Sequence, residues 1–104
     1  MGRLLYGSPP AAFELDDRTL AHVEIVVIAK LRRSESFAFS LPGKGDARTS
    51  IWLSPASDVQ FEYAKGSQEV NRAWLEVLIE SANSPQGLRI GAEPDAKTAA
   101  ATGV

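Results

Sequence analysis

The absence of cysteine from all 104 residues constrains this chain more than any other feature. A chain without cysteine forms no disulfide and offers neither a thiolate metal ligand nor a thiol nucleophile, so its fold depends on a packed apolar core. The hydrophobic content of 44% can supply that core, since a domain of about 100 residues buries roughly two-thirds of the surface that its unfolded chain exposes. We therefore expect a single domain over residues 1–93. The alanine-rich residues 94–104 are expected to form a mobile tail.

The charge balance and the hydropathy pattern argue against several classes of partner. The chain has 11 Lys and Arg residues and 13 Asp and Glu residues, so its formal net charge is −2, unlike the basic balance of most nucleic-acid-binding domains. No apolar run approaches the roughly 20 residues that a membrane helix needs. The turn at residues 7–10 also interrupts the N-terminal segment before a secretory signal can form. With one histidine and no cysteine, we expect no metal site and no cofactor. Without a secretory signal or a membrane helix, we expect a cytoplasmic location.

Hydrophobic periodicity divides the chain into six strands and two helices. The strands are expected at residues 3–6, 11–15, 35–41, 49–53, 59–64 and 88–90. Alternation is clearest in 35–41, where Phe37, Phe39 and Leu41 share one face. Short connections between the third, fourth and fifth strands favour an antiparallel meander.

The first helix is expected to begin after Asp16, which is a good N-cap residue, and to end near Arg33. Leu20, Val23, Val27 and Leu31 then share one buried stripe. The β-branched run 24–28 would also suit a strand by propensity. The cap and the helical spacing favour a helix.

The second helix is expected over residues 68–82, with Ser67 as its cap, although Asn71 also suits a cap position. Its apolar stripe is expected to contain Val70, Trp74, Val77 and Leu78. The element order is therefore ββαβββαβ. This order predicts a two-layer α+β fold in which both helices cover one face of a mostly antiparallel sheet.

Trp52 is the first candidate for a binding role. If Ile51 and Leu53 face the helices, alternation along the strand places Trp52 on the opposite face. A two-layer fold leaves that face open, and tryptophan commonly anchors a partner at such a surface. Ser50 and Ala38 are expected to be its small neighbours. We therefore take Trp52, Ser50 and Ala38 as a candidate partner surface.

Five basic residues are candidate phosphate or nucleic-acid contacts: Arg18, Lys30, Arg32, Arg33 and Arg72. Three of them cluster at the end of the first helix, where they could bind phosphate. The same charges complement the helix macrodipole, which is a purely structural role. A nucleic-acid site requires the five side chains to converge on one face.

His22 is the candidate for catalysis, because only histidine titrates near neutral pH without help. A general base needs a hydrogen-bonded partner and an orienting group. Arg18, four residues earlier, shares the helical face of His22, and its positive charge disfavours an imidazolium. We therefore expect His22 to be structural.

Several strings together indicate a family resemblance. They are MGRLLYG at 1–7, DRTLAH at 17–22, KLRR at 30–33, ESF at 35–37, WLSP at 52–55, NRAW at 71–74 and SANS at 81–84. On these residues the chain resembles a family of short actinobacterial proteins of unknown function over nearly its whole length. Members of that family are often labelled ATP-dependent DNA ligase. The resemblance brings with it no known catalytic residues.

The residues do not support ligase chemistry. Such an enzyme needs a lysine nucleophile in a Lys-x-Asp-Gly setting, within a domain much longer than this chain. Lys44 comes nearest, because Asp46 follows it, but Ala47 stands where the motif has glycine.

Three functional hypotheses follow from these patterns. The leading one is a non-enzymatic interaction module that binds protein, or a second copy of itself, through an open sheet face or a sheet edge. The alternative is a nucleic-acid-binding accessory domain that uses the five basic residues. The least favoured is an enzyme centred on His22.

Overall fold

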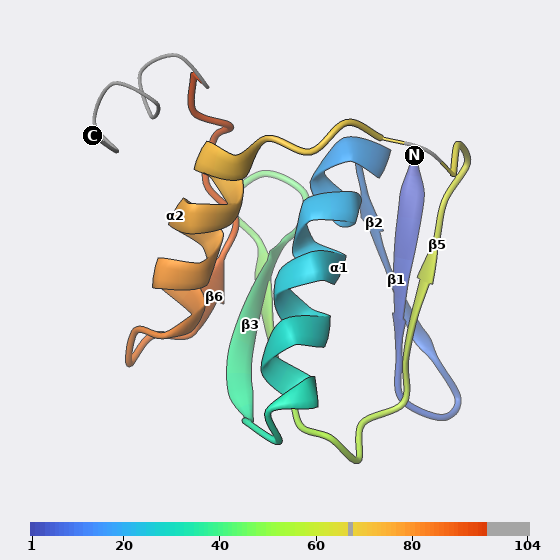
Figure 1. Ribbon diagram of the computed structural model, residues 1–104. Coiled ribbons are helices and arrows are strands. Elements are labelled where there is room, and N and C mark those ends of the chain that lie inside the picture. Colours follow the sequence, from blue (N-terminus) through green and yellow to red (C-terminus); the bar gives the residue numbers. More distant parts are fainter. Residues whose placement is uncertain (67, 96–104) are drawn as a thin grey trace.

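A computed structural model describes residues 1–66 and 68–95 of the chain. The elements in chain order are β1 (Gly2–Tyr6), β2 (Ala11–Leu15), α1 (Asp17–Arg32), β3 (Phe37–Pro42), β4 (Arg48–Leu53), β5 (Val59–Glu62), α2 (Arg72–Ala82) and β6 (Leu88–Arg89) (Figure 1). The α+β class and the order ββαβββαβ are confirmed. The expected cap at Ser67 and the part of the expected tail at 96–104 lie outside the described residues.

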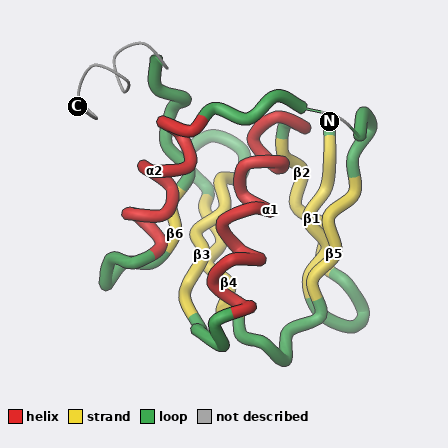
Figure 2. Tube along the Cα trace, in the orientation of Figure 1, coloured by secondary structure: helices red, strands yellow, loops and turns green. Residues whose placement is uncertain are grey.

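The strands form two small sheets instead of one. The first sheet has the order β2-β1-β5 and is antiparallel throughout. The second has the order β4-β3-β6, in which β3 pairs antiparallel with β4 and parallel with β6. Both helices lie on the same side of the strands, so the two-layer arrangement holds (Figure 2).

The expected three-strand meander is wrong at its last strand, because β5 pairs with β1 and not with β4. The turn after β4 is closed by its own serines, since the Ser54 N–H donates to Ser57 Oγ at 3.0 Å. The Gly7 N–H then donates to the Asp58 carbonyl oxygen at 2.9 Å. These bonds direct the chain from the second sheet to the free edge of β1.

The start of α1 follows its sequence signals. Oδ2 of Asp16 accepts hydrogen bonds from the backbone N–H groups of Arg18 and Thr19 at 3.2 and 3.4 Å, so Asp16 is the N-cap. Leu15 and Leu20 flank this cap and are both buried. The β-branched residues of α1 that face the sheets are also buried, and this burial outweighs their weak helix propensity.

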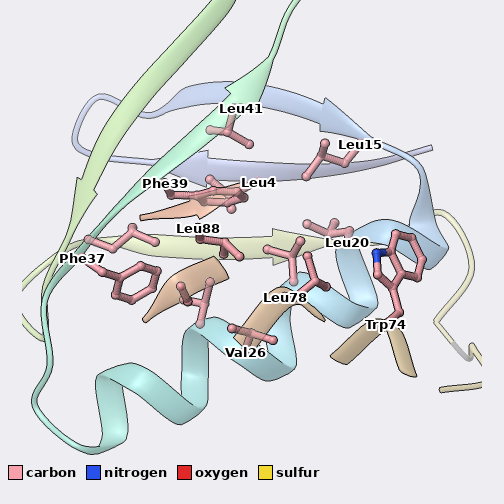
Figure 3. Packing of buried hydrophobic residues seen from close by; sticks show 14 residues of the cluster. Leu4, Leu15, Leu20, Val26, Phe37, Phe39, Leu41, Trp74, Leu78 and Leu88 are labelled. Atoms are coloured by element: carbon pink, nitrogen blue, oxygen red, sulfur yellow. The ribbon is translucent and has the colours of Figure 1, made fainter. Parts of the chain in front are cut away.

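The core lies between the two helices and the inner faces of both sheets (Figure 3). Leu4 comes from the first sheet, Phe39 and Leu88 come from the second, and Leu20 and Leu78 come from the helices; all five are fully buried. Because the helices cover only one side, no helix of the described residues lies over the opposite face of either sheet (Figure 1).

The buried stripe of α2 differs from the expected one at two positions. The helix begins at Arg72, after the N-cap Asn71, so Val70 precedes it and is 50% exposed. The buried residues Trp74, Leu78 and Ala82 follow a four-residue spacing, which turns Val77 to the side, where it is 45% exposed.

Candidate interaction surface

Alternation along β4 turns Trp52 away from the core, as its sequence predicts. Leu53 is fully buried and Ile51 is half-buried against the core, whereas Trp52 between them is 59% exposed. We call the side of β4-β3-β6 that carries Trp52 the outer face. Its residues are Arg48, Ser50 and Trp52 of β4, Ala38, Ser40 and Pro42 of β3, and Arg89 of β6.

Small residues surround Trp52 on the outer face. Ala38 pairs directly with Trp52 across the strands, and Ser40 pairs with Ser50. Their two hydroxyl oxygens lie 3.4 Å apart. Gly87, just before β6, packs closely against Ala38, because a Cβ at this position would lie 2.4 Å from the Ala38 carbonyl oxygen. A partner can therefore approach the backbone of this sheet closely beside the indole.

A hydrogen bond fixes the backbone of Trp52, whereas its ring is exposed. The hydroxyl of Tyr6, at the end of β1, donates to the Trp52 carbonyl oxygen at 2.6 Å. This bond joins the first sheet to the edge strand of the second. It fixes the position of the Trp52 backbone in the edge strand.

Two arginines on the outer face, Arg48 and Arg89, are not among the five basic candidate residues taken from the sequence. Arg48 and Arg89 line a shallow hollow of about 260 Å³ together with Ser40. Arg48 could have been found by extending the alternation from Trp52 through Ser50. Arg89 could not, because its place depends on the parallel pairing of β6 with β3, for which the sequence gives no local signal.

The five basic candidate residues do not converge. The helices run side by side in the same direction, and Arg18 and Arg72 lie near their N-terminal ends (Figure 1). Lys30, Arg32 and Arg33 lie at the C-terminal end of α1, roughly 20 Å away from Arg18 at 1.5 Å per residue. The five residues therefore do not form one compact cluster.

Two of these basic residues are also engaged within the chain. The ammonium of Lys30 lies 2.8 Å from Glu35 Oε1 and donates to Asn83 Oδ1 at 2.7 Å. Arg18 donates to both carboxylate oxygens of Glu93 at 2.8 and 2.7 Å and to the Glu69 carbonyl oxygen at 2.8 Å. These contacts leave Lys30 and Arg18 few N–H donors for an external phosphate.

His22 is fully buried, and both of its ring nitrogens are engaged by backbone groups. Nδ1 lies 2.7 Å from the Arg18 carbonyl oxygen, and Nε2 accepts from the Asn71 N–H at 2.8 Å. These partners fit the neutral tautomer that carries its proton on Nδ1. The ring also packs on Trp74, with the ring centroids 4.7 Å apart. His22 therefore joins the two helices.

A polar network surrounds this contact. Asn71 Oδ1 caps α2 by accepting from the Ala73 N–H at 3.0 Å, as the sequence suggested. Its Nδ2 donates to Glu93 Oε2 at 2.8 Å and to the Pro94 carbonyl oxygen at 3.0 Å. The hydrogen bonds from Arg18 and then from Asn71 lower the pKa of Glu93 to about 2. The segment after β6 is thus fastened to the N-terminal ends of both helices.

Within residues 1–66 and 68–95, no three His, Cys, Asp or Glu side chains are grouped in a way that could hold a metal ion. No helix in that part of the chain is long and apolar enough to span a membrane.

The comparisons with known proteins give one match. No curated protein and no solved structure matches the chain. A family model described as a domain of unknown function (DUF7882) matches residues 1–93. On that match, the chain belongs to the DUF7882 family of domains of unknown function.

Proposed function

We propose that this chain is a non-enzymatic interaction module that binds protein through the outer face of β4-β3-β6. The observation that carries the proposal is the 59% exposure of Trp52 on a sheet face that no helix covers. An aromatic side chain contributes about 150–250 Å² when it is buried. At about 25 cal/mol per Å², covering the exposed part of the indole is among the largest apolar gains this surface offers.

The neighbours of Trp52 support the same proposal. Ala38 and Ser50 have small side chains that do not cover the indole, so a partner side chain can pack against the ring. Tryptophan is enriched among the residues that dominate binding energy at protein interfaces. The hydrogen bond from Tyr6 fixes the Trp52 backbone before a partner binds. Less conformational entropy of the backbone is then lost on binding, which favours affinity.

The non-enzymatic part of the proposal is supported by His22. A general base needs a nitrogen that can reach a substrate, and both nitrogens of this buried ring are engaged by backbone groups. The nucleic-acid alternative drew on the ligase label of similar sequences and on five basic residues. Arg18 lies at the opposite end of α1 from Lys30, Arg32 and Arg33, and Arg72 lies on α2, so the five residues offer no compact basic cluster in its support.

Site-specific photo-crosslinking tests the proposal. A benzophenone amino acid replaces Trp52 in one variant and Glu80, an exposed residue of α2, in a control variant. Irradiation in cells that naturally contain the protein should give crosslinked products at position 52 that are absent at position 80. Excess wild-type protein should suppress these products, and excess Trp52→Ala protein should not.

The outcomes separate the possibilities. A product whose mass is twice that of the chain identifies a second copy as the partner. A product with another protein identifies a different partner, and both results support the proposal. Equal products at positions 52 and 80, or none at position 52, would overturn it.

A further inference from the structure

The hollow on the same outer face as Trp52 has the composition of an anion site. Arg48 lies on β4, Arg89 lies on β6, and Ser40 lies on the strand between them. Ser40 pairs with both neighbouring strands, opposite Ser50 on one side and Arg89 on the other. Arg48, Ser40 and Arg89 therefore line one hollow from three adjacent strands.

The two arginines have no acidic partner among the described residues. No carboxylate in that part of the chain lies within 4.0 Å of the guanidinium group of Arg48 or Arg89, whereas Arg3 pairs with Glu62 and Arg18 pairs with Glu93. Asp46 also lines the hollow. Two arginines and one aspartate leave the hollow with one net positive charge, which matches a single carboxylate better than it matches a chain of phosphates.

We propose that this hollow binds a carboxylate group of the protein partner, so that the outer face recognises an acidic extended segment; the inference rests on the proposed function. An arginine guanidinium presents paired N–H donors that match the two oxygens of a carboxylate. Ser40 also lines the hollow; it is buried, and its hydroxyl lies 3.4 Å from that of Ser50. The net charge of −2 on the whole chain disfavours a polyanion at long range.

The spacing on β4 specifies the segment further. Arg48 and Trp52 are four residues apart on the same strand and on the same face. They are therefore separated by about 13 Å at 3.3 Å per residue. An extended segment that runs along β4 has the same spacing. Its acidic residue should stand four positions from the apolar residue that covers Trp52, because an even spacing keeps both side chains on one face.

NMR titration of the isotope-labelled protein tests this inference. The probe is the peptide acetyl-Phe-Thr-Ser-Thr-Glu-amide, and its control carries Gln in place of Glu. We expect shifts at the backbone amides of Ser40, Arg48 and Arg89 and at the Trp52 indole. The Glu peptide should bind roughly tenfold more tightly, because a charge-assisted hydrogen bond contributes more than a neutral one.

Matched variants locate the effect. The double substitution Arg48→Gln with Arg89→Gln should remove the preference for the Glu peptide, and Arg72→Gln, on α2, should keep it. Equal affinity for both peptides, or no shift at Ser40, Arg48 and Arg89 at millimolar peptide, would overturn the inference. Tighter binding of a short oligothymidine than of the Glu peptide would overturn it in favour of nucleic acid.

The test separates this inference from the proposed function. If the Glu preference holds while position 52 gives no crosslinked product, the hollow binds carboxylates but the proposed function, protein binding around Trp52, is wrong. If position 52 is crosslinked and the Glu preference is missing, only the carboxylate assignment is wrong.

Discussion

The phenolic hydroxyl of Tyr6 donates a hydrogen bond of 2.6 Å to the backbone carbonyl of Trp52. Tyr6 ends β1 in the first sheet, and Trp52 lies on the edge strand of the second. The bond therefore connects two sheets that share no strand pairing among the described elements. It also positions the residue on which the proposed partner surface is centred.

Replacing Tyr6 with Phe removes this bond and keeps the ring. We expect the free energy of unfolding to fall by about 0.5–1.5 kcal/mol, the usual net contribution of one hydrogen bond. Urea denaturation followed by circular dichroism measures the change. An unchanged midpoint would mean that water replaces the hydroxyl without loss.

Replacing His22 with Leu should destabilise the protein more than Tyr6→Phe does. The substitution leaves the buried Asn71 N–H and the Arg18 carbonyl without their side-chain partner. An unsatisfied buried polar group costs about 1–3 kcal/mol. Urea denaturation of His22→Leu measures the loss, and Ile25→Ala, at an exposed position of α1, is the control. A loss no larger than that of the control would contradict the structural role of His22.

Glu93 should make stability depend on pH in the acidic range. Its pKa is lowered from 4.5 to about 2 by Arg18 and Asn71. A carboxyl group with a lowered pKa in the folded state stabilises the fold above its unfolded pKa. That contribution is therefore lost as the pH falls from 4.5 towards 2.

The melting temperature of the Glu93→Gln variant, measured across that pH range, checks this prediction. It should fall less steeply than that of the wild type. Glu35, whose pKa Lys30 also lowers, stays in both proteins, so the difference between the two curves isolates Glu93. Parallel curves would contradict the assigned role of Glu93.

Gly87 should not tolerate a side chain. Its φ of +82° lies in the left-handed region, and an added Cβ would meet the Ala38 carbonyl oxygen at 2.4 Å. We expect Gly87→Ala to destabilise the fold by about 1–3 kcal/mol, the usual range for a strained backbone position. Gly91→Ala is the control, because a Cβ there has open space. Equal unfolding midpoints for the two variants would contradict this reading of the turn.

The local features of this fold could be predicted from the sequence. The caps at Asp16 and Asn71 depend on a side chain and on backbone groups two or three residues away, so neighbouring residues are enough to indicate them. The outward direction of Trp52 follows from alternation with Ile51 and Leu53 in the same way.

The pairing of distant strands could not be predicted. No residue pattern within β5 indicates whether it pairs with β1 or with β4. The strand β6 has two residues and is too short to show hydrophobic alternation. The hollow of the candidate site depends on this pairing, since it brings Arg89 to Arg48. The sequence therefore indicated the aromatic half of the surface but not the pairing that brings Arg89 to it.

The two sheets are interleaved along the chain, and this affects how the protein acquires its structure. The first sheet takes β1, β2 and then β5, and the second takes β3, β4 and then β6, so the chain passes between the sheets three times. Neither sheet is complete before a distant strand has been synthesised, and the second needs residues 88–89. The separate hairpins can form early on a ribosome, but the closure of both sheets has a high contact order. No cut in the chain therefore yields two halves that each contain a whole sheet.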